Sequence, residues 1–189
     1  MQNRKDDIRN TAARLFRKKG YGATSMRNIA EGVGIQAASI YNHFGSKQVL
    51  LQDLLMLPAN LYTEEMKAVK CSNLSPREKI EKLVKHHVHM AVEHTDAVAL
   101  IVADWAHLEG EARTHFFQLR EDYETDFKEI IEIGKTNGSF NPNINTDVAV
   151  FSILSTLRWL FSWYNRNKSF DVEELEKQMI QVLLGGTCL

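Results

Sequence analysis

The stretch Thr24–Lys47 concentrates side chains whose chemistry suits binding to a nucleic acid. Hydroxyl, imidazole and ammonium groups can bind phosphate oxygens, whereas glutamine and arginine can pair with base edges. The sequence holds no nucleophile paired with a base and no phosphate-binding loop, so an enzyme is not expected and no catalytic residue is assigned. The candidate nucleic-acid contacts are Thr24, Ser25, Arg27, Gln36, Ala37, Ala38, Ser39, Tyr41, Asn42, His43 and Lys47.

Some of these candidates are suited to reading bases. Gln36 can pair with adenine, and the methyl groups of Ala37 and Ala38 can contact the methyl groups of thymine. Arg27 can pair with guanine, or it can bind a phosphate together with Ser25 at the start of a helix. An exposed helix cap and a surface arginine are the alternative interpretation of the last two residues.

Two short helices joined by a tight turn are predicted to position these side chains. The first starts at Thr24 or Ser25, because hydroxyl groups cap the unpaired N–H groups of a helix start. The glycines of Gly32–Gly34 break it, since glycine readily adopts positive φ. The second helix runs over Gln36–Phe44. This is helix-turn-helix spacing, and the second helix has a size that fits the major groove of DNA.

Longer helices are predicted on both sides of this pair. Residues 4–19 carry apolar side chains at helical spacing, and Gly20 stands where a C-terminal cap belongs. Ser46 caps a further helix that starts at Lys47. A cation at that position opposes the helix dipole, which favours Lys47 as a phosphate contact. Pro58 either kinks this helix or ends it.

The region Arg4–Leu54 resembles the DNA-binding domain of the tetracycline-repressor (TetR) family of bacterial regulators. The resemblance is carried by AARLFRKKGYGATSMRNIAEGVGI and SIYNHFGSKQVLL. It implies an all-α fold of about nine helices. A three-helix DNA-binding domain would occupy residues 1–48, and a helical domain for effector binding and dimerisation would occupy residues 49–189.

The same resemblance implies that Ser39, Tyr41 and His43 hold the phosphate backbone of DNA. Asn42 can reach a base or a phosphate. For His43, packing at the end of the helix is the alternative interpretation.

The charge distribution agrees with a phosphate-binding N-terminal part. The whole chain has a formal net charge of −1. Residues 1–50 hold nine Lys or Arg and three acidic residues, a net charge of +6, so the remaining residues carry −7. A basic module on an acidic body fits DNA binding, and a chance cluster on a solvated face is the alternative.

Composition is that of an ordinary globular protein, with 44% apolar and 25% charged residues. Cys71 and Cys188 form no metal or redox motif, which favours a reduced, cytoplasmic protein. The first ten residues are too polar for a signal peptide. The segment Val148–Tyr164 is too short and too polar to span a bilayer, so no membrane partner is expected.

Four histidines, His86, His87, His89 and His94, fall on the helix predicted over Pro76–His94. Only His87 and His94 share a face, so no metal and no cofactor are expected. These two lie on the inward side, where they would line a cavity or be satisfied in the core.

Further helices are predicted over Asp96–Leu108, Glu111–Asn137 and Asn145–Asn165, and a last helix is capped by Asp171. The helix over Asn145–Asn165 is apolar nearly all round, so it must be covered on every side. One side can pack on the body and the other on a second copy. We therefore predict a homodimer through the last two helices, residues 146–186, which matches a pseudo-palindromic operator in double-stranded DNA.

Arg158 stands in the middle of that apolar helix and, if buried, needs an anion. Asp104, Glu109 or another carboxylate can supply it, as can the carboxylate or phosphate of a ligand. The predicted effector site consists of Arg158 with aromatic walls, namely Trp105, Tyr123, Phe127, Trp159 and Trp163.

The segments WAHLEGEAR and LREDYETDF resemble family members that respond to acyl-CoA or fatty-acyl compounds. The predicted function is therefore a DNA-binding transcriptional regulator, a repressor that a small-molecule effector releases, with an acyl-CoA as the favoured effector. A drug-responsive efflux regulator and a ligand-independent architectural DNA binder are the alternatives.

Overall fold

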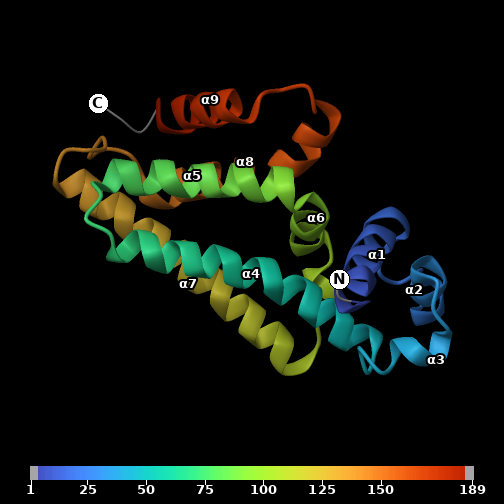
Figure 1. Cartoon of the computed structure of the whole chain (residues 1–189). Helices are drawn as coiled ribbons and strands as arrows, with labels where there is room; N and C mark the ends of the chain where they lie inside the picture. The colour runs from blue at the N-terminus through green and yellow to red at the C-terminus, as the bar shows by residue number, and fades with distance from the viewer. Residues whose placement is uncertain (1–3, 186–189) are drawn as a thin grey trace. The chain divides into compact units, whose positions relative to one another are not determined.

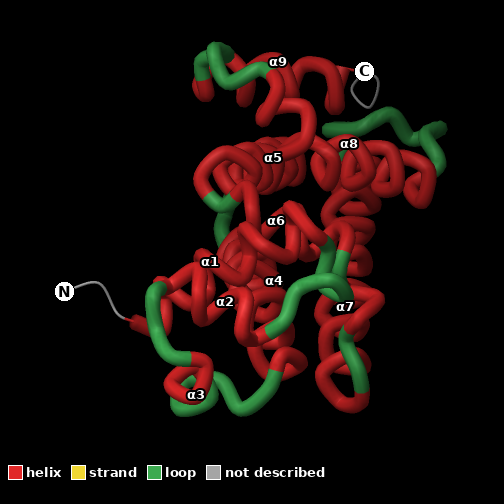
Figure 2. Tube along the Cα trace, turned by 90° about the vertical axis from the view of Figure 1, so that its right-hand side faces the viewer, coloured by secondary structure: helices red, strands yellow, loops and turns green. Residues whose placement is uncertain are grey.

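The computed structural model describes residues 4–185, and every regular element in that range is helical (Figure 1). Figure 2 shows the helices joined by loops. The predicted all-α fold is confirmed. The segments 1–3 and 186–189 lie outside the described residues, and with them Cys188 and the last residue of the predicted dimer segment. The elements are α1 (Arg4–Lys19), α2 (Met26–Val33), α3 (Ala37–Ile40), α4 (Lys47–Cys71), α5 (Pro76–Glu93), α6 (Thr95–Ala103), the 3₁₀ turn η1 (Trp105–His107), α7 (Gly110–Thr136), α8 (Thr146–Arg166) and α9 (Val172–Gly185).

These elements form two compact units. The N-terminal unit comprises the chain up to Ala59 together with Asp96–Phe116, and the helical body comprises Asn60–Thr95 and the chain from Phe117 onward. The helices α4 and α7 therefore contribute to both units. The packing thus divides the chain elsewhere than at the predicted boundary after residue 48, which remains a prediction about function.

Pro58 lies inside α4, two residues before the helical body begins. The helix continues through it to Cys71, so Pro58 does not end the helix. Because proline has no N–H, the carbonyl of Leu54 lacks its usual helical donor at this point.

The core of the N-terminal unit is formed by apolar side chains of its first helices and of the segment that follows them. Ile8 of α1, Ile29 of α2 and Ile40 of α3 are fully buried, and Phe44 is buried beside them. Close packing requires a glycine in α2, since a Cβ on Gly32 would lie 2.7 Å from Thr11 Cγ2. The glycine pair breaks the helix later than predicted, because α2 continues to Val33 and ends at Gly34, whose φ is +74°.

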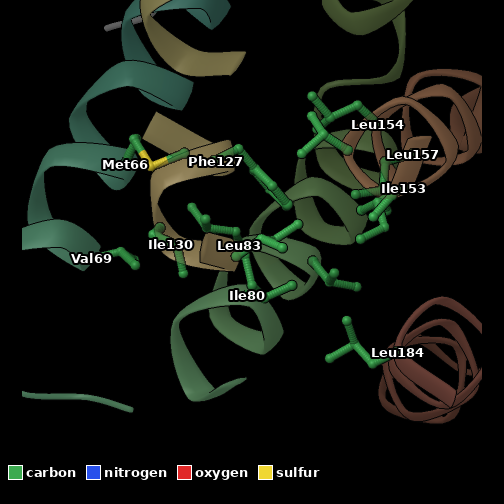
Figure 3. Packing of buried hydrophobic residues seen from close by; sticks show 14 of the residues in the cluster. Met66, Val69, Ile80, Leu83, Phe127, Ile130, Ile153, Leu154, Leu157 and Leu184 are labelled. Carbon is green, nitrogen blue, oxygen red and sulfur yellow. The ribbon is translucent and has the colours of Figure 1, made fainter. Parts of the chain in front are cut away.

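The helical body has a core of its own, drawn from α4, α5, α7, α8 and α9 (Figure 3). Met66, Phe127 and Leu154 are among its buried members. The predicted start of α5 is confirmed, because Ser75 and Glu78 form a reciprocal capping box. Among residues 4–185, no helix has both the length and the apolar character that a membrane span needs.

The α-helix predicted over Asp96–Leu108 is shorter in the structure. The α-helix ends at Ala103, and η1 follows after Asp104. Asp104 has ψ near 0°, which departs from α-helical geometry. Its carboxylate is buried and accepts a hydrogen bond from the backbone N–H of Tyr21. The chain thus bends where a buried acidic group needs a donor.

Candidate nucleic-acid interface

A hollow of about 420 Å³ lies at the N-terminus of α2. Ser25 caps this helix, because its side chain accepts the N–H of Asn28 at 3.1 Å, and Asn28 in turn accepts the N–H of Ser25 at 3.0 Å. The first two residues of the helix keep N–H groups that no helical carbonyl can accept. The hollow is lined by Gly22, Ala23, Thr24, Ser25, Met26, Arg27, Tyr41 and Lys47.

Lys47 reaches this hollow from the first turn of α4, a helix that Ser46 caps as predicted through the N–H of Val49. The Lys47 ammonium lies 4.2 Å from the centroid of the Tyr21 ring. It donates to the backbone oxygens of Tyr21 and Thr24, each at 3.0 Å. Since an ammonium carries three N–H donors, a third remains suitable for a phosphate oxygen.

Thr24 differs from the expectation that it contacts DNA. Only 1% of its surface is exposed, and its hydroxyl donates to the backbone oxygen of Gly20 at 3.0 Å. Its side chain therefore holds the loop between α1 and α2 and does not face solvent. The helix cap that the sequence left open between Thr24 and Ser25 is Ser25.

The predicted second helix of the pair is shorter than Gln36–Phe44. Only Ala37–Ile40 is α-helical, and Tyr41–His43 continues as a turn. The side chain of Gln36 makes no capping hydrogen bond, so the helix start lacks that support. The turn is closed by short-range bonds, such as the one from the His43 N–H to the Ile40 oxygen at 3.0 Å.

The outward face of this segment nevertheless agrees with the prediction. Gln36, Ala37 and Ala38 are exposed, and Ser39 is half-buried. The residues after the helix are exposed as well, namely Tyr41, Asn42 and His43. Because His43 is exposed, the alternative that it packs at the end of the helix is not favoured.

Arg27 points away from the core on the first turn of α2. Its side chain is 79% exposed and donates to Glu31 at 2.9 Å. A surface pair of this kind is worth only about 0.3–0.5 kcal/mol, so a phosphate or a base can replace Glu31 at little cost.

Arg158 is paired within the protein. It donates to Glu124 on α7, and Arg120 donates to the same carboxylate oxygen. Burial is the largest single influence and opposes ionisation of Glu124, but the hydrogen bonds and charges of Arg158 and Arg120 together outweigh it and lower the pKa of Glu124. The side chain of Arg158 is 32% exposed, so its guanidinium is only partly buried.

A cluster of rings lies near Arg158 in the helical body. The ring of Tyr62 stacks on His87, with centroids 4.5 Å apart, and His87 Nε2 lies 2.9 Å from the hydroxyl of Tyr123. Burial lowers the pKa of His87 to about 3 and raises the pKa of Tyr123. His87 is thus a hydrogen-bonded core group, whereas His94, predicted beside it, is exposed at the C-terminal cap of α5.

The remaining predicted effector residues have different surroundings. Phe127 is fully buried in the core of the body, whereas Trp159 and Trp163 are 61% and 39% exposed on α8. Trp105 belongs to the other compact unit. Within residues 4–185, no group of three potential metal ligands is present.

Sequence reasoning missed Tyr62 and Glu124, both of which contact the predicted site residues. Tyr62 lies on α4, 25 residues before His87, and helical spacing within α4 does not reveal what it stacks on. Glu124 offers a weak signal, since it lies four residues after Arg120 and four-residue pairs meet on one helix face.

Comparison with known protein families decides the family. Residues 73–187 match the model described as the tetracyclin repressor-like C-terminal domain, and residues 8–54 match the model of bacterial regulatory proteins of the tetR family. The chain belongs to the TetR family. It is therefore a DNA-binding transcriptional regulator and not an enzyme.

Several TetR relatives match along nearly the whole chain. The HTH-type transcriptional repressor KstR2 of Rhodococcus jostii is 28% identical over 185 residues, covering 97% of this chain and 90% of the relative. The solved structure of the ketosteroid transcriptional regulator KstR2 of Mycobacterium tuberculosis shares the fold, with a TM-score of 0.93 at 22% identity, covering 100% of this chain and 97% of that one. AibR, solved in complex with isovaleryl coenzyme A and operator DNA, has a TM-score of 0.82 at 25% identity, covering 95% and 97%.

Proposed function

We propose that the chain is a repressor that binds a pseudo-palindromic operator in double-stranded DNA as a homodimer. It would act in the cytoplasm, where bacterial DNA lies, and leave the operator when a small-molecule effector binds. The observation that carries this proposal is the hollow at the N-terminus of α2, beside the exposed leading turn of α3. The KstR2 relatives that match nearly the whole chain are named repressors.

Within this surface, phosphate contacts are assigned to Ser25, Ser39, Tyr41, His43 and Lys47. A phosphate in the hollow would meet the ammonium of Lys47, the hydroxyl of Tyr41 and the positive end of the α2 dipole. Such charge-assisted hydrogen bonds are about twice as strong as neutral ones.

Base reading is assigned to the leading turn of α3 and to one arginine. Gln36, Ala37 and Ala38 are exposed there, and Asn42 and Arg27 flank them. Because α3 is only four residues long, only its first turn can enter the major groove as regular helix.

The homodimer is assigned to α8 and α9. An exposed apolar stripe runs along α8 opposite its buried face, with Val148 61%, Phe151 70% and Trp159 61% exposed. Val182 on α9 is 72% exposed. Exposed apolar side chains of this kind favour an interaction site, and two helices from each protomer would cover them.

The effector is assigned to the acyl-CoA class. AibR, which shares the fold along nearly the whole chain, was solved with isovaleryl coenzyme A. In this chain, the cluster of Tyr62, His87 and Tyr123 supplies a polar point inside an otherwise apolar body. Next to it, His86 Nε2 is buried without a hydrogen-bond partner among the described residues. Such an atom costs about 1–3 kcal/mol, which a ligand can recover.

A cationic drug is a weaker candidate for the effector. It would require a buried carboxylate among the aromatic side chains. Asp104 is buried, but it belongs to the N-terminal unit and accepts the N–H of Tyr21.

Fluorescence anisotropy tests the proposal. The probe is a duplex that the wild-type protein selects from a random library, and its affinity is measured across salt concentrations. The double variant Tyr41→Phe, Lys47→Met should bind all duplexes more weakly, and its salt slope should fall by about 1 because one phosphate contact is lost. The control Lys67→Met removes the same charge from an exposed site on α4 and should leave the slope unchanged. An unchanged slope in the double variant would show that the DNA-binding surface lies elsewhere.

The same assay tests the effector class. Isovaleryl-CoA, hexanoyl-CoA or palmitoyl-CoA is added to the preformed complex, and free coenzyme A serves as the control. By linkage, a thioester that releases DNA must bind the DNA-bound protein more weakly than the free protein. If none of the three releases the duplex, the acyl-CoA assignment is wrong while DNA binding stands.

A further inference from the structure

The segment of α6 and η1 is tied to the DNA-binding helices within the N-terminal unit. Arg17 of α1 donates to Asp96 at 2.5 Å. Gln48 of α4 donates to the backbone oxygen of His107 at 2.8 Å. The segment thus contacts both the first helix and the helix that carries Lys47.

A third tie runs through a pair of rings. His107 stacks on Tyr21, with centroids 5.0 Å apart and an interplanar angle of 27°. Tyr21 is 8% exposed, and Phe16 packs against its edge at 5.1 Å. The ring of Tyr21 therefore has neighbours that restrict where it can lie.

Tyr21 in turn holds Lys47. Its ring lies under the ammonium at 4.2 Å, and its backbone oxygen accepts a hydrogen bond from that ammonium at 3.0 Å. The backbone N–H of Tyr21 donates to the buried carboxylate of Asp104. The backbone oxygen of Tyr21 thus contacts Lys47 on α4, and its backbone N–H contacts Asp104, which lies just before η1.

We infer that His107 and Asp104 are positioning residues for DNA binding, which act by fixing Tyr21 and thereby the ammonium of Lys47. The inference rests on the proposed phosphate contact of Lys47. It adds a role for two residues more than 50 positions after the helix-turn-helix. The imidazole of His107 stacks on the ring of Tyr21, and the carboxylate of Asp104 accepts its backbone N–H. One residue therefore restrains the side chain of Tyr21 and the other restrains its backbone.

Removing the His107 imidazole should leave Lys47 less ordered before DNA binds. Without the imidazole, Tyr21 loses a stacking partner, and Lys47 must be ordered when DNA binds. A ring pair of this geometry corresponds to about a three- to ten-fold change in an equilibrium constant. The number of phosphate contacts stays the same, so the salt slope should stay the same.

The experiment measures the affinity and salt slope of the full-length protein for the selected duplex. His107→Ala should raise Kd about three- to ten-fold at an unchanged slope, and His107→Phe, which retains a ring, should restore Kd to within about two-fold. Asp104→Ala should weaken binding, whereas Asp104→Asn keeps an acceptor for the Tyr21 N–H and should weaken it less. His115→Ala, an exposed site on α7, is the matched control.

A double-mutant cycle with Lys47→Met supplies the decisive readout. In that background, His107→Ala should change Kd less than two-fold, because the group that it positions is gone. Additive losses, a salt slope lowered by His107→Ala alone, or equal losses in His107→Ala and His107→Phe would each overturn the inference. If Lys47→Met leaves both Kd and slope unchanged, the proposed phosphate contact fails, and this inference fails with it. If His107→Ala does not fold, the comparison of Asp104→Ala with Asp104→Asn decides.

Discussion

His87 should make the helical body lose stability as the pH falls below neutral. Its ring is 6% exposed, stacks on Tyr62 and forms a hydrogen bond with Tyr123. Burial lowers its pKa from 6.5 in the unfolded chain to about 3. Between these two values the unfolded chain binds the proton and the folded chain does not, so protonation favours unfolding.

The magnitude follows from the two pKa values. Each unit is worth about 1.4 kcal/mol, and the full difference of about 5 kcal/mol is reached below pH 3. At pH 5 the contribution already lost is about 2 kcal/mol, and near pH 7.5 almost nothing is lost. Stability from His87 is therefore fully present above its unfolded pKa and declines as the pH falls through 6.5 toward 3.

Urea unfolding at pH 7.5, 6 and 5 measures this effect, with far-UV circular dichroism as the signal. The protomer concentration is held constant, because the stability of a dimer depends on it. The wild type should lose about 2 kcal/mol more than His87→Gln between pH 7.5 and 5, since glutamine does not titrate. A loss of stability in His87→Gln that is the same at every pH does not affect this comparison, because only the change between pH 7.5 and 5 is compared. His115→Gln, an exposed histidine, should follow the wild type. Parallel curves for the wild type and His87→Gln would refute the reasoning.

Two further substitutions follow from the packing. Phe151→Glu should dissociate the proposed dimer without unfolding the protomer, because Phe151 is 70% exposed on α8. Sedimentation velocity measures this dissociation. The control Ile133→Glu changes a residue that is 52% exposed on α7 and should leave the dimer intact. Gly134→Ala should lower the free energy of unfolding by about 1–3 kcal/mol. Alanine is normally better than glycine in a helix by about 1 kcal/mol, but its Cβ here would lie 2.1 Å from a ring carbon of Phe140. Gly45→Ala is the control, because its added Cβ would have no atom within 4 Å. If Gly134→Ala instead stabilises the protein, Phe140 must move aside.

Local features of the fold were predictable because the atoms that decide them are close in sequence. Ser75 and Glu78 are three residues apart and form the capping box of α5, whose predicted start at Pro76 is confirmed. Ile40 and Phe44 are four residues apart and both are buried, although only Ile40 lies within α3. The end of α3 was not predictable in this way, because Gln36 gives its helix no side-chain cap and Tyr41–His43 can form a turn while still projecting outward.

Pairs that are distant in sequence mark where prediction failed. Helical spacing places Arg158 on one face of α8, but it does not tell which carboxylate of another helix lies opposite. The structure pairs it with Glu124, 34 residues earlier. Tyr21 and His107 are separated by 86 residues, and neither residue type indicates which side chain it contacts. Burial of Thr24 likewise depends on how the loop after α1 folds back, so a hydroxyl at the right position for DNA turned out to face inward.

The pairing of Arg158 also bears on the chemistry of the effector. An anionic group that bound this guanidinium would compete with Glu124, which lies in place and has a lowered pKa. Displacing Glu124 leaves a second carboxylate near the site, and like charges in a partly buried place repel each other. His86 Nε2 needs only one hydrogen bond and no counterion. In the tautomer that carries its proton on Nε2, His86 can donate to a neutral acceptor such as the carbonyl of a thioester, at lower cost than a carboxylate fits Arg158.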